Sequence, residues 1–499
     1  MEGKNNSEKG KPDNLKWWVL FTVIIGTFLG RLDGTIVNLA MPKIISDFSI
    51  TVSAAGWIST AYIIANAVFV PIWGKLGDSI GRKKVYIFGF SIFIFGSALA
   101  GFAWNLNSMI FFRIIQAIAS SADYPTAMAI IAVTFREGKE RAQALGIWSV
   151  SFAAAAVFGP LLGGPLIDYF GWRSVFLINI PIGLLGILLA VTFINESVSG
   201  TKILKFDLVG ALTLGVFLSS LVLVLDKGIE WGWGSANSLI SYLVCIVSFA
   251  IFIFTEKTHP DPLIDFKFFK NSVFVGALIN NFAVFMAMIG AVFLVPLFVQ
   301  IFLGYGATQT GILFMPMAVA MVLASAIGGK LVGKVKSNYI IFASTIIAAL
   351  GIYLFAVMLD PRSGPIDVII PISIMAFGMG LGMAQRTNII ASAVPQHEIG
   401  VASSVLALAR NIAGAFGIAV FATILNSSIK QNAINLSANS HITDPAAYQQ
   451  FVALIMLKSQ MLAYLTVFKV AALVLFIASF GALFIKIKKE SNIAVHVES

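Results

Sequence analysis

The chain has 499 residues, of which 58% are hydrophobic and only 11% are charged. A soluble domain usually carries about a quarter charged residues, so this composition excludes a cytosolic enzyme, a disordered scaffold and a nucleic-acid-binding protein. The sequence therefore predicts an integral membrane protein. Its formal net charge of +10 is interpreted first as a signal of membrane orientation. The single cysteine, Cys245, excludes an intramolecular disulfide.

Fourteen apolar segments are long enough to cross the hydrocarbon layer, which requires about 20 residues of helix. None of them alternates with a period of two, so the predicted fold class is all-α. In chain order the predicted spans are 17–39, 54–74, 85–103, 107–133, 142–167, 174–194, 207–226, 237–254, 273–301, 309–330, 339–358, 367–391, 401–426 and 460–486.

Lysine and arginine predict the orientation of these spans. When the N-terminus is placed in the cytoplasm, most of the basic residues outside the spans fall in inner segments. We therefore expect both termini in the cytoplasm and a multi-pass protein of the plasma membrane, which is the inner membrane in a bacterium. The long polar stretch Asn426–Lys458 is expected outside.

A faint internal repeat suggests two halves. Gly74-Lys75-Leu76 and Gly329-Lys330-Leu331 each end a span and enter an inner loop. Repeated halves are typical of transporters, which bind substrate between them. The expected domains are an N-terminal tail (1–16), a six-helix bundle (17–194), a linker with two additional spans (195–272), a second six-helix bundle (273–486) and a C-terminal tail (487–499).

The first of these inner loops has a distinctive pattern, G-K-L-G-D-S-I-G-R-K-K over residues 74–84. Glycines allow helix ends to approach closely, and an acid beside two basic residues can form a charge network at the inner mouth. The alternative is an ordinary basic inner loop. The pattern resembles the inner-loop signature of the major facilitator superfamily, and its candidate gate residues are Gly74, Asp78, Gly81, Arg82 and Lys83.

Three further stretches resemble the fourteen-helix drug:proton antiporters of that superfamily. Leu32–Pro42 reads L-D-G-T-I-V-N-L-A-M-P, Arg113–Gln116 matches R-x-x-Q with Ala117 in place of a glycine, and Gly159–Gly164 reads G-P-L-L-G-G. The resemblance implies two pseudo-symmetric six-helix bundles, an inserted helix pair and proton-coupled multidrug efflux.

Ionisable residues inside spans are functional hypotheses by default, because burying them is costly. The helical rise places Asp33 and Arg113 at similar depths, and the resemblance implies that their helices are neighbours. We hypothesise that Asp33 is the proton-coupling carboxylate, since burial favours its protonated form and a nearby arginine its charged form. The alternative is a permanent ion pair between the two helices. The seven such residues are Arg31, Asp33, Arg113, Asp123, Arg386, Arg410 and Lys469.

Asp123 departs from the family pattern. With Arg113, Gln116 and Ser120 it forms one stripe at helical spacing, which should face a watery cavity. It is either a second proton or cation site or the partner that neutralises Arg31. The residues expected to line the substrate cavity are Arg31, Asn38, Gln116, Ser120, Met379, Met383, Arg386 and Arg410.

Two other features have both a functional and a structural interpretation. The methionines near Arg386, at positions 375, 379 and 383, form either an adaptable substrate wall or core packing. Pro160 should bend its helix, and the flanking glycines should allow close packing. The group Gly159, Pro160, Gly163 and Gly164 is therefore either a seal or hinge for alternating access or a site of ordinary tight packing.

The motifs of the chain favour a transporter over an enzyme. The chain contains no Walker A loop, G-x-S-x-G element or cluster of metal ligands, so we expect no enzyme, no cofactor and no metal. The expected function is proton-driven export of lipophilic, cationic small molecules by a monomer whose partners are substrate, protons and the lipid bilayer. One alternative is export of anionic amphiphiles such as fatty acids or organic acids, because basic residues outnumber acids inside the spans. A remote alternative is a non-transporting receptor or scaffold.

Overall fold

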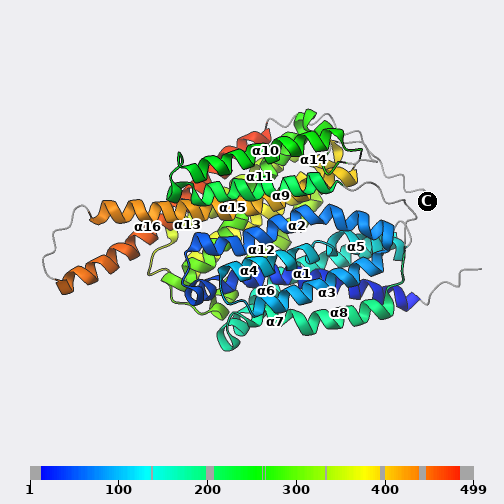
Figure 1. Ribbon diagram of the computed structural model, residues 1–499, viewed down its shortest axis with the longest axis horizontal. Helices are drawn as coiled ribbons and strands as arrows, with labels where there is room; N and C mark the ends of the chain where they lie inside the picture. Colours follow the sequence, from blue (N-terminus) through cyan, green and yellow to red (C-terminus); the bar gives the residue numbers. More distant parts are fainter. Residues whose placement is uncertain are drawn as a thin grey trace, which may run out of the picture.

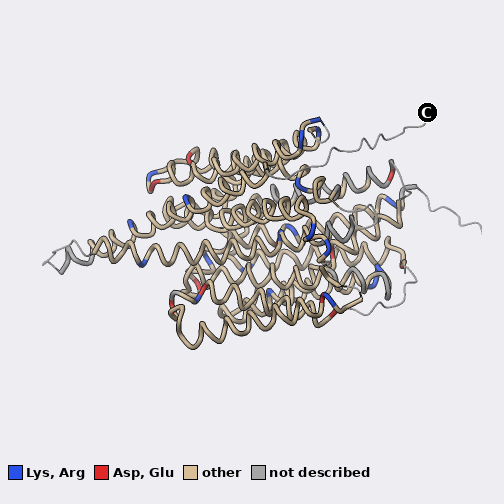
Figure 2. The backbone as a smooth tube through the Cα atoms, turned by 90° about the horizontal axis from the view of Figure 1, so that it is seen from above, with Lys and Arg blue, Asp and Glu red and all other residues tan. Residues whose placement is uncertain are grey.

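The computed structural model describes residues 13–135, 139–197, 207–260, 262–264, 266–331, 334–393, 399–437 and 445–483. Within these ranges every regular element is helical, as the composition and span pattern predict. Figure 1 shows the helices running along one common axis. Charged residues are sparse along the bundle and gather towards its ends (Figure 2).

The first half contains the helices that later position the site. They are α1 (Asp13–Phe48), α2 (Val52–Ile80), α3 (Arg82–Gly101), α4 (Leu106–Ser120), α5 (Asp123–Thr134), α6 (Lys139–Phe170), α7 (Ser174–Leu177) and α8 (Asn179–Phe193).

A pair of helices and a short 3-10 helix follow before the second half. The pair lies along one face of the bundle (Figure 1), and the Trp57 indole N–H of α2 donates to Asp226 of the pair at 2.9 Å. These elements are α9 (Leu208–Trp231), α10 (Ala236–Thr258) and η1 (Phe266–Lys270). The second half comprises α11 (Ser272–Phe302), α12 (Ala307–Leu331), α13 (Ser337–Met358), α14 (Pro365–Ser392), α15 (Ile399–Ser437) and α16 (Pro445–Leu483).

Twelve helices in the described ranges are long and apolar enough to cross a membrane. The predicted span 107–133 is instead divided between α4 and α5, each too short to qualify alone. Pro125 accounts for the division, because its ring lacks an N–H and clashes with the carbonyl group four residues earlier. The predicted span 142–167 lies within α6. The count of fourteen spans and the cytoplasmic position of both termini stay predictions, as do the domain boundaries.

The last two helices are much longer than a bilayer requires. Each has 39 residues, about 58 Å of helix against a hydrocarbon layer of about 30 Å. They project beyond the bundle at the left of Figure 1. Much of the polar stretch expected in an outer loop is therefore helical, and Asn432 Nδ2 donates to the Ser459 carbonyl at 3.3 Å between the two helices. Hydropathy detects only the part of a helix that lies in lipid.

The two halves meet at the end of the bundle where α1 and α6 finish and α12 begins, which we call the distal end. The Asp168 carboxylate of α6 accepts hydrogen bonds from the backbone N–H groups of Ala307 and Thr308, at 3.0 and 2.8 Å. Gln300 of α11 donates to the Leu39 carbonyl of α1 at 3.0 Å. An acid at a helix N-terminus satisfies free N–H groups and complements the helix dipole, so Asp168 stabilises contact between the halves.

Asp168→Ala should therefore lower thermal stability. Loss of such a cap costs about 0.5–2 kcal/mol, and the unfolding temperature of the purified protein in detergent measures it. Glu230→Gln is a matched control, because Glu230 forms an exposed surface pair with Lys227 that contributes little. Equal unfolding temperatures for the two variants would contradict the assigned role of Asp168.

Candidate functional site

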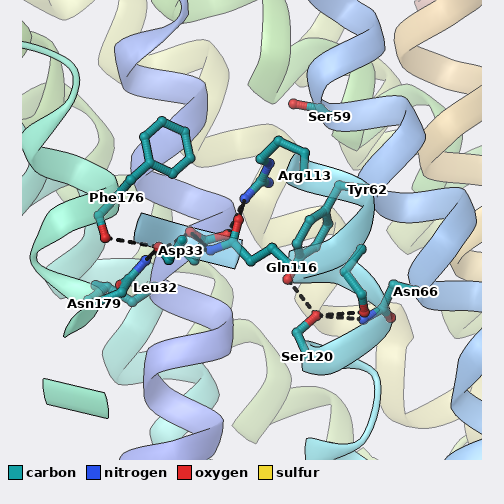
Figure 3. A network of polar contacts seen from close by, with 12 residues as sticks. Leu32, Asp33, Ser59, Tyr62, Asn66, Arg113, Gln116, Ser120, Phe176 and Asn179 are labelled. Carbon is teal, nitrogen blue, oxygen red and sulfur yellow. Dashed lines mark hydrogen bonds and ion pairs between the residues drawn. The ribbon is translucent and has the colours of Figure 1, made fainter. Parts of the chain in front are cut away.

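Asp33 and Arg113 form a buried ion pair inside the first half (Figure 3). Arg113 Nη1 lies 2.5 Å from Asp33 Oδ2, and the two side chains are 2% and 0% exposed. The guanidinium carbon also lies 4.0 Å from the centre of the Tyr62 ring of α2. The structure thus brings together the two residues that helix geometry places at one depth on α1 and α4.

Three neutral side chains complete the environment of this pair. Gln116 Nε2 and Asn179 Nδ2 donate to Asp33 Oδ1 at 2.9 and 3.0 Å. Both amides also donate to Ser97 Oγ, at 3.1 and 2.9 Å, and Ser97 in turn donates to the Phe176 carbonyl at 2.9 Å. Each carboxylate oxygen of Asp33 therefore has a donor. Charge-assisted hydrogen bonds of this kind are short and strong, so the network holds the Asp33 side chain in a fixed position between α1, α4 and α8.

Polar contacts continue along α4 towards its end. Ser120 Oγ accepts hydrogen bonds from the Tyr62 hydroxyl at 2.7 Å and from Asn66 Nδ2 at 3.0 Å (Figure 3). Asn38 Oδ1 of α1 accepts one from Ser59 Oγ of α2 at 3.3 Å. Ser120 and Asn38, both expected to line the cavity, thus join helices within the first half.

Asp123 is the first residue of α5, directly after the break. Its Oδ1 atom is buried and has no hydrogen-bond partner in the described part of the chain. The residue lines a small cavity with Gly26 and Tyr86. The Thr27 hydroxyl forms a hydrogen bond with the Asp123 carboxylate, and the positive charge of Arg31 attracts it. The attraction to Arg31 is consistent with a neutralising pair between Arg31 and Asp123. The unpartnered Oδ1 atom is consistent with a proton or cation site.

A double-mutant cycle distinguishes these alternatives. We expect Asp123→Asn and Arg31→Gln each to lower the free energy of unfolding, and the double variant to lose less than their sum. Interacting charges typically give a coupling of about 0.5–3 kcal/mol. Thermal or denaturant unfolding in detergent measures it. Additive losses would exclude the pair and favour a separate protonation site at Asp123.

Among the described residues, no acid pairs with Arg386 or Arg410. Arg386 of α14 is 1% exposed, and Arg410 of α15 is half-buried beside Thr387 of α14. The two methionines expected near them differ, because Met379 is 5% exposed within the core whereas Met383 is 39% exposed. Met379 therefore packs in the core. Of these two methionines, only Met383 is exposed enough to contact a ligand.

The inner-loop motif contacts an acidic residue, Glu196, which was not among the candidates from the sequence. Gly81 has a φ of +117°, and a Cβ atom there would lie 2.5 Å from the Glu196 carboxylate. Glu196 accepts hydrogen bonds from the backbone N–H groups of Lys83 and Lys84 at 3.1 and 3.2 Å. Arg82 N–H donates to the carbonyl of residue 197 at 3.1 Å. The expected network through Asp78 stays a prediction, because the structure describes the backbone of Gly74 and Asp78 within α2 but not their side-chain surroundings.

The glycines of α6 pack against both halves. A Cβ atom at Gly163 would lie 2.9 Å from Ile36 of α1, and one at Gly159 would overlap another α1 side chain. One at Gly164 would overlap the Thr308 backbone of α12. Pro160 lies within α6, and its carbonyl contacts α12. This group occupies the seam where the halves meet at the distal end.

Several polar residues of the site were missed by the sequence analysis. In the first half these are Ser97 and Asn179, and in the second half Asn280 and Asn281, which contact Arg386 and Arg410. Two adjacent asparagines inside the apolar span 273–301 were a visible signal, because unpaired amides are costly in lipid.

A family description, the Major Facilitator Superfamily, matches residues 23–418, from α1 into α15. The chain belongs to the major facilitator superfamily. The superfamily and the similar proteins below are membrane transporters and not enzymes, and the chain is an integral protein of the plasma membrane.

Similar proteins of this superfamily include named multidrug transporters. The chain is 34% identical to the multidrug transporter protein MdtP of Bacillus subtilis over 426 residues, covering 84% of this chain and 77% of that protein. It is 30% identical to the multidrug export protein EmrB of Haemophilus influenzae over 417 residues, covering 83% and 81%. It is 31% identical to the riboflavin transporter RibZ of Clostridioides difficile over 420 residues, covering 84% and 90%.

Solved structures share the fold. A bacterial homolog of the human lysosomal transporter Spinster, in an inward-facing and unoccupied conformation, superposes with a TM-score of 0.68 at 17% identity. The match covers 96% of this chain and all of that one. At this identity the likeness concerns the fold alone.

Proposed function

We propose that the chain is a proton-coupled antiporter that exports lipophilic small molecules by alternating access. The observation that carries the proposal is the buried Asp33–Arg113 pair, which places a protonatable group and a fixed positive charge inside the first half. Kinship with multidrug transporters supports lipophilic substrates.

In the proposed cycle, a proton neutralises Asp33 and releases Arg113 from it. The amides of Gln116 and Asn179 then lose their charged acceptor, so α4 and α8 can shift relative to α1. Opening and closing of the seam between α6 and α12 would expose the substrate site to alternate sides. We further propose that both termini lie in the cytoplasm and that the transporter acts as a monomer.

Two substrate classes remain candidates. Lipophilic cations are the first, because they could compete with the proton for an acid. Anionic amphiphiles are the second, and a specific observation favours them. Arg386 and Arg410 have no carboxylate partner among the described residues, whereas Asp33 already has a donor at each oxygen.

The experiment uses proteoliposomes with an imposed pH gradient. Two probes report on the classes, tetraphenylphosphonium as a lipophilic cation and 11-(dansylamino)undecanoic acid as an anionic amphiphile. We expect gradient-driven movement of at least one probe, which stops when an ionophore collapses the gradient. Movement of neither probe, or movement that is independent of the gradient, would contradict a proton-coupled exporter and favour a receptor or scaffold.

A further inference from the structure

In the described part of the chain, the hydrogen-bond partners of the buried Arg386 side chain are all neutral. Its Nε donates to Asn280 Oδ1 of α11 at 2.9 Å. Its Nη2 donates to Ser344 Oγ and Thr345 Oγ1 of α13, at 3.2 and 3.0 Å. No carboxylate in the described ranges pairs with it, so its positive charge is not cancelled locally. An uncompensated buried charge attracts an anion strongly.

Arg410 lies next to this charge but is accessible. Its side chain is half-buried, its Nη2 donates to Thr387 Oγ1 at 3.2 Å, and its Nε lies 3.4 Å from Asn281 Oδ1. Thr387 is exposed, as is Met383 one turn earlier on α14. Tyr124 of the first half, 42% exposed, lies near Arg410. We expect a partly exposed charged group within the helix bundle to face a watery space and not lipid.

One buried donor beside Arg386 and Arg410, the side-chain amide of Asn281, lacks an acceptor among the described residues. Asn281 is 0% exposed, and its Nδ2 has no hydrogen-bond partner in the described part of the chain. Unsatisfied buried donors are uncommon, and an acceptor that is absent from the structure is one explanation for them. Asn281 follows Asn280 directly on α11, so adjacent amides connect the two arginines. The cluster offers donors and positive charge.

Apolar groups adjoin these donors. The Arg410 guanidinium carbon lies 4.9 Å from the centre of the Phe285 ring, one turn after Asn281 on α11. Met383 adds an adaptable side chain on α14. A ligand with one anionic head and an apolar body would match both parts of this surface.

We propose that Arg410, Asn281 and Thr387 bind the anionic head group, a carboxylate or sulfonate, of an amphiphilic substrate. Phe285 and Met383 contact its apolar part. Arg386 does not contact the ligand and acts as a positioning residue, which orders α11 and supplies positive potential. In the first half, by contrast, the buried Arg113 is already neutralised by Asp33. This proposal rests on the proposed function, since it names the substrate class of the same transporter.

Binding of a matched pair of probes tests the subsite without any gradient. The full chain in detergent is titrated with 11-(dansylamino)undecanoic acid and with its methyl ester, which differ only in the carboxylate, and dansyl fluorescence is followed. We expect the wild-type chain to bind the acid at least tenfold more tightly than the ester. Equal affinities would overturn the proposal, and this comparison needs no variant.

Variants then locate the site. Arg410→Gln should weaken binding of the acid at least tenfold and change binding of the ester less than twofold. Asn281→Asp should have the same effect, because it places a carboxylate beside Arg410 at almost unchanged shape. Arg362→Gln, in the exposed turn before α14, is the matched control and should change neither affinity. Equal weakening of acid and ester by the first two variants would overturn the assignment.

The binding test of the subsite and the transport test of the proposed function can fail independently. Selective binding of the acid without gradient-driven movement of either probe would leave the subsite intact and contradict the transporter proposal. Gradient-driven movement of tetraphenylphosphonium, with acid and ester bound alike, would contradict the subsite alone.

Discussion

Asp33→Asn should abolish proton-driven exchange, because an amide cannot take up and release the coupling proton. The variant also leaves Arg113, 2% exposed, without its counter-charge. Breaking a buried pair in this way costs about 3–5 kcal/mol, so thermal stability should fall as well. Exchange is measured in proteoliposomes at equal amounts of folded protein, determined by size-exclusion chromatography.

The double variant Asp33→Asn/Arg113→Gln separates coupling from stability. Both charges are removed, so we expect most of the lost stability to return while proton-driven exchange stays absent. A permanent structural ion pair predicts the opposite, namely that exchange returns together with stability. Full exchange in either variant would rule out Asp33 as the coupling carboxylate.

Gly164→Val should open the distal end. A Cβ atom at Gly164 would overlap the Thr308 backbone, so α6 and α12 could no longer approach as they do in the structure. Overpacking costs about 1–3 kcal/mol, which makes the closed arrangement roughly 5- to 150-fold less populated. Proton-coupled exchange should fall accordingly.

Thiol accessibility measures this change. A cysteine replacing the buried Leu39, at the seam beside Gln300, is introduced together with Cys245→Ser and labelled with a membrane-impermeant reagent. Labelling should be slow without Gly164→Val and faster with it. Gly329→Val on α12 is the matched control, because a Cβ atom there meets nothing within 4 Å. Similar labelling rates in both glycine variants would contradict a seal at Gly164.

Sequence patterning predicted the membrane class and most helix positions, since hydrophobic runs report lipid contact directly. It did not predict where helices extend beyond lipid, as α15 and α16 do, because backbone hydrogen bonds and packing continue the helix there. The division between α4 and α5 had a local signal in Pro125. Hydropathy alone treats that segment as one span.

The contacts of the site that depend on depth in the membrane could be predicted from the sequence. Asp33 and Arg113 could be paired because the rise per residue gives depth along a helix. Ser97 and Asn179 could not be placed, since a single sequence does not give the rotation of one helix against another. The same limit applied to Asn281, whose open donor is evident only once α11, α14 and α15 are packed together.

Simultaneous measurement of proton and substrate flux shows whether the chain couples the movement of substrate to that of protons. Proteoliposomes containing a pH-sensitive dye and an imposed gradient receive the transported probe, and internal pH and probe movement are followed together. If Asp33 couples the two fluxes, probe movement dissipates the gradient through the wild-type chain, and Asp33→Asn/Arg113→Gln stops both fluxes. Probe movement without proton flux through the wild-type chain, or unchanged proton flux through the double variant, would contradict this coupling.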